Sequence, residues 1–388
     1  MSRIDDLIAE YCPDGVKHQT LGEIGEFIRG NGIQKRDFQD SGFGCIHYGQ
    51  IYTYYGLFAD HTKSFIDPNL AEKRKKAYKG DLVIATTSEN EEDVCKACAW
   101  LGEEPIAISG DAYIFRHHQN PKYISYCFQS ELFQSQKKKY ITGTKVLRVN
   151  GDAMAKIHVP VPPLPVQEEI VRILDSFSSL EAELEAELEA RRKQYAYYRN
   201  ELLTFERERV LIASLGELCK ISVGRKNGTA GEFGEYPYVN AGTSMSGFVN
   251  EWSEEGDCVT TPSRGQGGMG FVAYQASRFW CGPLCYVMRS KHSDVMIKYV
   301  YYYLCSHKAD ILGLVHEGGT PAINKSELAG LRILVPPFEE QRRIVSILDR
   351  FDKLTNDLSS GLPAEIEARR KQYEYYRDRL LSFDELAV

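Results

Sequence analysis

The chain contains two copies of a long pair of sequence blocks, and this internal repeat constrains its fold more than any other feature. The first block reads VPPLPVQEEIVRILDSF at 161–177 and VPPFEEQRRIVSILDRF at 335–351. The second reads EARRKQYAYYRNELLTF at 189–205 and EARRKQYEYYRDRLLSF at 367–383. The second copy carries four extra residues between the blocks, about one helical turn. Strings this long do not recur by chance, so the chain is two modules in tandem.

Fainter repeats precede each pair of blocks. LGEI at 21–24 matches LGEL at 215–218, and GDLV at 80–83 matches GDCV at 256–259. Each module is therefore a variable domain followed by a near-identical helical segment. We expect variable domains over 1–160 and 208–334, and helical repeats over 161–207 and 335–388.

The repeated segments have the pattern of long helices. In the first copy, apolar residues follow at steps of three and four from Ile170 to Leu202, with prolines at the entry. This predicts a helix over about 166–206, on the order of 60 Å long. The second copy is interrupted by SSGLP at 359–363, where Gly361 suits a helix end and Pro363 a helix start. We expect a break there, a restart near Ala364, and an antiparallel coiled coil between the two repeats.

The variable segments read as mixed α and β. Short β-branched or aromatic runs at 81–85, 271–274 and 284–288 alternate with glycine-rich turns, and 297–305 looks helical. The expected fold class is α+β: two mixed α/β domains separated by long helices that form an antiparallel coiled coil.

No catalytic or metal-binding motif stands out. GQGGMG at 265–270 fits a dinucleotide fingerprint, but a strand-like segment follows it where a helix is required. Cys95 and Cys98 form a lone C-x-x-C, whereas zinc sites need a second pair. His117 and His118 would point to opposite faces of a strand. We therefore expect no cofactor, no metal and no catalytic residue in this chain.

Composition fits a soluble globular chain. It is 43% hydrophobic and 26% charged, with a net charge of -7 that argues against nonspecific coating of nucleic acid. No apolar run approaches the roughly 18 residues of a membrane span, and the N-terminus is not a secretory signal. We expect a cytoplasmic protein without a membrane segment, and its ten cysteines read as buried thiols.

The polar residues of the predicted loops are instead of the types that contact DNA. Arg, Lys, Asn and Gln recognise base edges, while Ser, Thr and Tyr position phosphates. The runs Lys73 to Lys79 and Lys137 to Lys139 are further phosphate candidates, although charged runs are often only solvated faces. The predicted DNA contacts are Asn31, Gln34, Lys35, Tyr48, Gln50, Thr87, Ser88, Arg225, Asn240, Ser263, Arg264 and Gln266. Arg264 and Gln266 are favoured, because they follow the GDCV strand as Thr87 and Ser88 follow GDLV.

On its helical repeats and paired upstream motifs, nearly the whole chain resembles a specificity subunit of a type I restriction–modification system. The resemblance implies that each variable domain is a target-recognition domain reading one half of a split, asymmetric site in double-stranded DNA. The helices would set the spacing and dock two methyltransferase subunits, which carry S-adenosylmethionine, and two nuclease subunits would join for cleavage. The predicted partner-docking residues are Gln167, Ile170, Gln341, Ile344, Arg369 and Tyr373.

Two other classes remain open. A coiled-coil adaptor with protein-binding heads would explain the helices equally well, but it explains less well why similar heads differ while the stems match. An enzyme using the glycine loop or the cysteines would need catalytic residues that the sequence does not offer.

Overall fold

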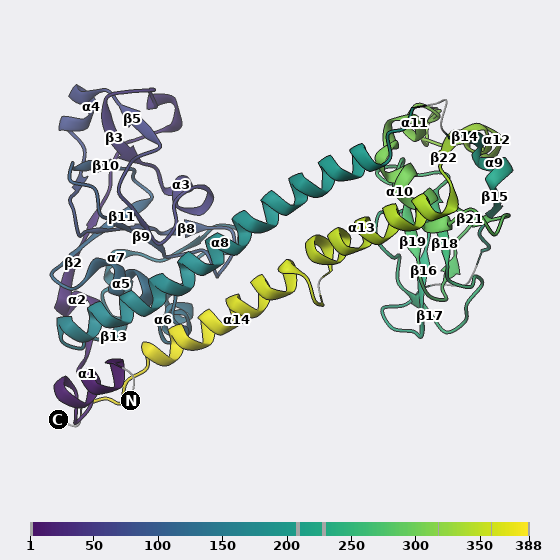
Figure 1. Cartoon of the computed structure of the whole chain (residues 1–388). Coiled ribbons are helices and arrows are strands. Elements are labelled where there is room, and N and C mark those ends of the chain that lie inside the picture. The colour runs from purple at the N-terminus through teal and green to yellow at the C-terminus, as the bar shows by residue number, and fades with distance from the viewer. Residues whose placement is uncertain (1–2, 207–209, 227–229, 317, 358, 387–388) are drawn as a thin grey trace. The chain divides into compact units, whose positions relative to one another are not determined.

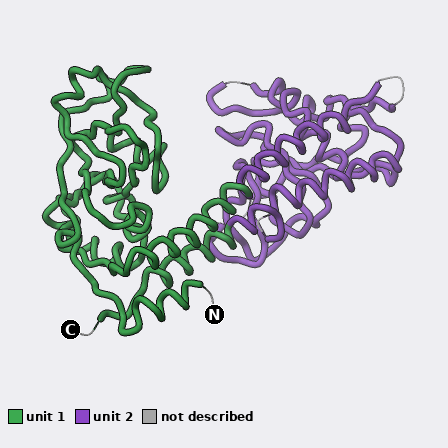
Figure 2. The backbone as a smooth tube through the Cα atoms, turned by 60° about the vertical axis from the view of Figure 1, so that its left-hand side comes forward, with its two compact units in different colours: residues 1–183, 367–388 green, residues 184–366 purple. Residues whose placement is uncertain are grey.

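A computed structural model describes residues 3–206, 210–226, 230–316, 318–357 and 359–386, which form two compact units (Figure 1). Unit 1 comprises residues 1–183 and 367–388, and unit 2 comprises residues 184–366 (Figure 2). The end of the chain thus returns to the unit in which it begins. Among the described residues, no helix is both long enough and apolar enough to cross a membrane.

Unit 1 is a mixed α/β domain. Its main sheet has the strand order β2–β11–β7–β9–β4, and a second sheet has the order β5–β3–β10–β6. Its strands are β1 (His18–Thr20), β2 (Gly25–Arg29), β3 (Phe43–Ile46), β4 (Phe58–Ala59), β5 (Ser64–Ile66), β6 (Lys76–Ala77), β7 (Leu82–Ala85), β8 (Thr87–Ser88), β9 (Lys96–Trp100), β10 (Ile106–Ile108), β11 (Ala112–His117), β12 (Leu147–Arg148) and β13 (His158–Pro160). Its short helices are α1 (Arg3–Tyr11), α2 (Leu21–Ile24), η1 (Lys35–Asp37), α3 (Tyr48–Thr53), α4 (Pro68–Glu72), α5 (Pro121–Cys127), α6 (Glu131–Lys137), η2 (Lys138–Tyr140) and α7 (Gly151–Met154).

Unit 2 repeats this plan. Its main sheet has the order β15–β21–β18–β19, and its second sheet has the order β17–β16–β20. Its strands are β14 (Leu211–Ser214), β15 (Cys219–Val223), β16 (Tyr236–Val239), β17 (Phe248–Val249), β18 (Cys258–Pro262), β19 (Ala273–Gln275), β20 (Trp280–Cys281), β21 (Cys285–Ser290) and β22 (Arg332–Val335). Its short helices are α9 (Leu215–Leu218), α10 (Ile297–Ser306), α11 (Lys308–Leu312) and α12 (Lys325–Gly330). The expected strands near 81–85, 271–274 and 284–288 and the helix at 297–305 are all present, with small shifts of their ends.

The same antiparallel ladder closes both units, and the faint sequence repeat lies beside it. In unit 1, β1 pairs with β13, and in unit 2, β14 pairs with β22. Thr20 then caps α2 by accepting from the Glu23 amide, and Ser214 caps α9 in the same way. Each cap is a capping box, which satisfies amides that a short helix would otherwise leave unpaired. LGEI and LGEL are therefore the same element in the two units.

The repeated blocks form the long helices. The first copy is one helix, α8 (Leu164–Leu202), and the second copy is two helices, α13 (Phe338–Asn356) and α14 (Leu362–Leu380). The expected break at 359–363 is confirmed. Gly361 is required there, because a Cβ atom would lie 2.5 Å from the Lys353 carbonyl oxygen.

The helices pair antiparallel within each unit. In unit 1, Phe177 of α8 stacks on Tyr376 of α14, with 5.5 Å between ring centroids. Further along α8, Glu181 pairs with Arg370, which is earlier in α14, so the two helices run in opposite directions. In unit 2, Phe351 of α13 stacks on Tyr198 of α8 at 5.7 Å, and Figure 1 shows these two helices running in opposite directions. The expected antiparallel pairing is confirmed inside each unit, as is the α+β fold class.

Matching contacts fix the start of each long helix to its domain. Asp175 on α8 accepts from the Tyr126 hydroxyl at 2.7 Å and pairs with Lys122 at 2.6 Å, both on α5. Asp349 on α13 is held by Tyr302 and Lys298 of α10 at 2.6 and 2.8 Å. A hydrogen bond to a charged group contributes about 1.5–3 kcal/mol. The repeated ILD sequence therefore encodes an anchor between domain and helix.

Candidate nucleic-acid interface

In unit 1, Asn31 joins two basic segments that are far apart in sequence. Its side-chain nitrogen donates to the Lys73 carbonyl at 3.1 Å, and its oxygen accepts from the Lys75 amide at 2.8 Å. Gly32 lies under Arg74, since a Cβ atom on it would be 2.7 Å from the guanidinium. Asn31 thus positions the basic run, and its own amide is engaged by backbone. Lys35 and Arg36 in the first segment and Lys73 and Lys75 in the second are exposed cations.

The helix α3 carries two further predicted contacts. Gln50 accepts from the His47 amide at 2.9 Å and donates to the Ser64 hydroxyl at 2.7 Å, so both ends of its amide stabilise the loop. The Tyr48 amide donates to the Ser109 hydroxyl at 2.9 Å, and its half-buried ring packs on His47. Gln34, at the start of η1, is exposed. The structure gives Gln50 a positioning role and leaves Gln34 on the surface.

Thr87 and Ser88 form β8, which pairs with Leu147 and Arg148 of β12. The Tyr52 hydroxyl donates to the Thr87 carbonyl at 2.8 Å and fixes this ladder to α3. Beside it lies a polar pocket of about 250 Å³. The pocket is lined by Arg29, Thr86, Thr87, Asp111, Tyr113, Tyr140, Thr142, Arg148, Val149 and Asn150.

In unit 2, one turn at 282–284 gathers three of the predicted segments. The Arg225 amide donates to the Cys281 carbonyl at 2.7 Å. The Asn240 side-chain oxygen accepts from the Leu284 amide at 2.9 Å, and the Ser263 amide donates to the Leu284 carbonyl at 2.9 Å. The structure therefore brings Arg225, Asn240 and Ser263 to one place, although they are widely separated in sequence.

The glycine motif at 265–270 builds this surface rather than a nucleotide site. A Cβ atom on Gly268 would lie 1.9 Å from the Ala241 carbonyl oxygen, so only glycine allows this loop to pack against residues 240–242. Strand β19 follows the loop, which removes the helix that a dinucleotide fingerprint needs. Arg264 and Gln266 are exposed beside this contact.

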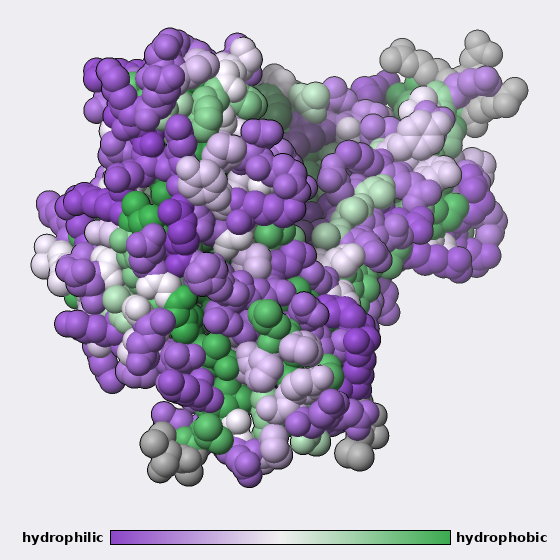
Figure 3. Space-filling view, turned by 90° about the vertical axis from the view of Figure 1, so that its left-hand side faces the viewer, coloured by the Kyte–Doolittle hydropathy of each residue, from purple (hydrophilic) through white to green (hydrophobic). Residues whose placement is uncertain are grey.

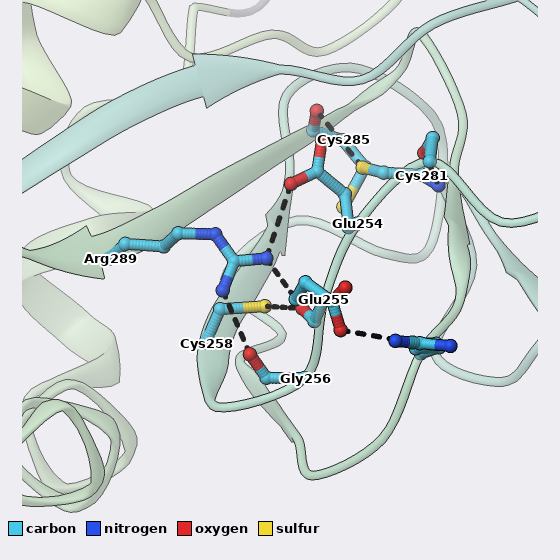
Figure 4. A network of polar contacts seen from close by, with 9 residues as sticks. Glu254, Glu255, Gly256, Cys258, Cys281, Cys285 and Arg289 are labelled. Carbon is cyan, nitrogen blue, oxygen red and sulfur yellow. Dashed lines mark hydrogen bonds and ion pairs between the residues drawn. The ribbon is translucent and has the colours of Figure 1, made fainter.

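Along β18 and β21 of unit 2, a network of polar contacts fixes the backbone (Figure 4). Arg289 donates to the Gly256 carbonyl at 2.8 Å and to the Glu254 carboxylate at 3.2 Å. The Cys285 thiol contacts the Thr261 carbonyl at 3.4 Å, and burial raises the pKa of Cys258 to about 12. A buried thiol with a raised pKa, such as that of Cys258, is a poor nucleophile and a poor metal ligand. Within the described part of the chain, no group of three His, Cys, Asp or Glu side chains could hold a metal ion.

The structure also shows where Lys137 of the second basic run and the histidine pair lie. Lys137 is 1% exposed, and its ammonium donates to the carbonyls of Glu91 and Val94 at 2.7 and 3.0 Å. The expectation that Lys137 contacts phosphate is therefore wrong, because its charge is used inside unit 1. His117 is buried in β11 and His118 is exposed, as their alternation on a strand predicts.

The partner-docking residues divide into two groups. Gln167, Ile170, Gln341 and Ile344 are at most 1% exposed and belong to the interiors of their units. These four predictions are corrected, since a buried side chain offers a partner no surface. Arg369 donates to Gln372 at 3.0 Å, and the Tyr373 hydroxyl donates to Gln129 at 3.1 Å. Both are half-buried, and their docking role stays a prediction.

The pocket residues Arg29, Asp111, Tyr113 and Arg148 are absent from the sequence-based set. They come together because β8 pairs with β12 and β2 pairs with β11. No local pattern reveals a two-residue ladder between segments so far apart. Arg29 stands two residues before Asn31, in the same polar run as the predicted contacts, so composition alone already pointed to it.

Comparisons with known proteins identify the family. The family model for the type I restriction modification DNA specificity domain matches residues 13–190 and 209–368. The EcoR124I/EcoR124II specificity subunit of Escherichia coli is 35% identical over 273 residues, which is 61% of this chain and 65% of that protein. The chain thus spans just under two thirds of that relative. A Mycoplasma pneumoniae protein designated a type I specificity subunit is 33% identical over 244 residues, which is 59% of this chain and 94% of that protein.

Solved structures share the fold. The S subunit of a type I restriction–modification system from M. genitalium aligns with a TM-score of 0.62 and 15% identity over 94% of this chain and 96% of that chain. The HsdS subunit from Thermoanaerobacter tengcongensis aligns with a TM-score of 0.52 and 16% identity over 96% of this chain and 97% of that chain. With the family match, these likenesses lead to one conclusion. The chain belongs to the family of type I restriction–modification specificity subunits, whose domains recognise DNA.

Proposed function

We propose that this chain reads a split, asymmetric DNA site, with one half recognised by unit 1 and the other by unit 2. One observation carries the proposal: the units share a strand plan but present different side chains at matching positions. The backbone N–H of Asn31 donates to the Ile108 carbonyl as that of Arg225 donates to the Cys281 carbonyl, so the two positions correspond. In unit 1 the side chain at this position holds the basic run at Lys73 and Lys75, and in unit 2 it is an exposed arginine. Identical readers would favour identical half-sites, and different readers favour different ones.

The chain acts as a recognition subunit without chemistry of its own. Methylation of adenine and cleavage of unmodified DNA belong to methyltransferase and nuclease subunits that assemble on it. Its contribution is to place them on a chosen sequence through base-edge and phosphate contacts. The buried thiols and the glycine loop support this division of roles, because the fold uses both for packing.

Genome-wide mapping of methylated adenines tests the proposal. The chain is expressed with its methyltransferase subunit in a host that lacks adenine methylation. A motif of two short specific blocks around a fixed gap, present only with this chain, is the expected result. A stable complex without a new motif would instead favour the adaptor function.

Arg264→Ala sharpens this test. Loss of a base-reading arginine relaxes one half-site by about 1–3 kcal/mol and leaves the other half unchanged. A motif unchanged in both halves would remove Arg264 from the reading set.

For docking, the helical repeats expose the same tyrosine twice. Tyr197 is 61% exposed and Tyr375 is 59% exposed, and both occupy the same position in EARRKQY-x-YYR. Each ring contacts the tyrosine that follows it, at 5.5 Å between centroids for Tyr197 and Tyr198 and 5.3 Å for Tyr375 and Tyr376, yet most of its surface stays exposed. Aromatic residues are enriched at protein interfaces. In the view of Figure 3, the face of unit 1 turned to the viewer is largely hydrophilic, with apolar residues gathered mainly in its lower part. We infer that each tyrosine contacts one methyltransferase subunit.

Native mass spectrometry tests the docking proposal. Tyr197→Ala and Tyr375→Ala are each expected to reduce the complex from two methyltransferase subunits to one, because aromatic residues dominate interface energies. Lys193→Ala is the control, since its side chain is 76% exposed on the same helix and pairs only locally with Glu189. Two bound subunits in both tyrosine variants would contradict the assignment.

A further inference from the structure

The two units can be aligned residue by residue at the ladder beside the pocket. Ala112 pairs with Ala85 in unit 1, as Cys285 pairs with Pro262 in unit 2. One residue further, the Thr86 amide donates to the Asp111 carbonyl at 3.2 Å, and the Ser263 amide donates to the Leu284 carbonyl at 2.9 Å. Thr86 and Ser263 are therefore equivalent.

The returning segments follow the same alignment. The Val149 amide donates to the Thr86 carbonyl at 3.2 Å, and the Ile323 amide donates to the Ser263 carbonyl at 3.0 Å. Val149 therefore corresponds to Ile323, and Arg148 corresponds to Ala322.

An arginine occupies this ladder in both units, but on opposite strands. In unit 1, Thr87 pairs with Arg148, and in unit 2, Arg264 pairs with Ala322. Both arginines are exposed. Because paired residues on one face of a ladder have Cβ atoms only about 5 Å apart, either strand can deliver a guanidinium to the same region.

We propose that Arg148 is the base-reading arginine of unit 1 and that it recognises the guanine of a G·C pair. This rests on the proposed function and names a residue of that function. Arginine binds guanine O6 and N7 through two parallel hydrogen bonds, which is the commonest specific contact to DNA.

The surroundings of Arg148 suit a whole G·C pair. Asp111 lines the same pocket. In a G·C pair the amino group of cytosine lies beside guanine O6, and a carboxylate can accept a hydrogen bond from it. Arg29 lines the pocket too, and its Nε donates to the Gly110 carbonyl at 3.1 Å, so its position is fixed by backbone. Tyr113 and Tyr140 provide rings on the remaining walls.

The test compares methylomes and duplex binding for the complete complex of this chain with its methyltransferase. Arg148→Ala is the variant. Lys145→Ala is the matched control, because Lys145 is an exposed cation of the same hairpin that does not line the pocket. In competition with duplexes changed at single positions, Arg148→Ala is expected to lose discrimination at one G·C pair by about 5- to 150-fold. The other half-site keeps its preference, and Lys145→Ala keeps both.

Each outcome decides between the possibilities. A split motif in the parent complex that Arg148→Ala leaves unchanged overturns the assignment while the proposed function stands. No split motif in the parent overturns both. Equal effects of Lys145→Ala and Arg148→Ala would show a charge effect and overturn base reading. If Arg148→Ala abolishes methylation, duplex competition is measured for Arg148→Ala and for Arg148→Lys. Preference for the G·C pair retained in both variants overturns the proposal. Loss of that preference in either variant supports it.

Discussion

The buried glutamine of each repeat should stabilise its unit rather than bind a partner, and Gln341→Leu tests this. Gln341 donates to the carbonyls of Asp294 and Pro336 at 3.0 and 2.9 Å and accepts from the Met296 amide at 2.9 Å. Leucine keeps most of the side-chain volume but removes all three hydrogen bonds.

The magnitude follows from these three contacts. A typical hydrogen bond contributes about 1 kcal/mol net, and a buried group left unpaired costs about 1–3 kcal/mol. Gln341 is only 1% exposed, so water cannot replace the lost partners. We expect the free energy of unfolding of unit 2 to fall by about 3–5 kcal/mol.

Tryptophan fluorescence during urea unfolding can follow each unit separately. The chain has three tryptophans, of which Trp252 and Trp280 lie in unit 2 and Trp100 lies in unit 1. A Trp100→Phe background therefore reports unit 2 alone. Arg342→Ala, which removes an exposed ion pair beside Gln341, should leave the transition nearly unchanged.

The reasoning fails if Gln341→Leu leaves the unfolding transition of unit 2 in place. An unchanged transition together with lost methyltransferase binding would restore the docking role that burial rules out. The equivalent change in unit 1 is Gln167→Leu, whose side chain bonds Asn120, Gln119 and Pro162 in the same manner. It should lower the stability of unit 1 by a similar amount.

Two further predictions concern pH and backbone packing. Burial lowers the pKa of His117 to about 4 from 6.5, so between these values only the unfolded chain takes up the proton and stability falls as pH falls. His117→Asn should remove up to about 3 kcal/mol of this pH dependence in acid unfolding curves, whereas His118→Asn at the exposed neighbouring site removes only a minor cause of the shift and should leave most of it in place. Gly268→Ala places a Cβ atom 1.9 Å from the Ala241 carbonyl and should relax only the half-site of unit 2 in the methylome; relaxation of the other half-site would contradict this.

Periodicity and repetition were enough to predict the fold class, the long helices and their break. Apolar steps of three and four residues depend only on local sequence, and SSGLP breaks a helix by its own chemistry. The length of the first helix was also close, since α8 spans Leu164–Leu202. What the helices bury was harder to predict. Ile170 and Ile344 read as a coiled-coil stripe, but they pack into the domain interiors.

The sequence was enough to predict which loops form the site, but not which residues of those loops contact one another. Asn31 and the lysine run each stood out by composition, yet their contact spans more than forty residues and leaves no local pattern. The role of Gln50 was missed for a related reason, because an amide suited to a base edge is equally suited to His47 and Ser64. Lys137 shows the same limit for charge, since a cation in a basic run can also serve buried carbonyls.

The return of the chain end to unit 1 has a consequence for synthesis. Leu381 is part of the unit 1 core, and the Val16 amide donates to the Asp384 carbonyl at 2.9 Å. Residues 184–366 leave the ribosome before these contacts exist, so unit 2 can be complete while unit 1 still lacks its last helix. At roughly 5–20 residues per second, the wait lasts on the order of 10–40 s. The domain that is made first is finished last, and a ribosome that stops early leaves the apolar side of α8 in unit 1 uncovered.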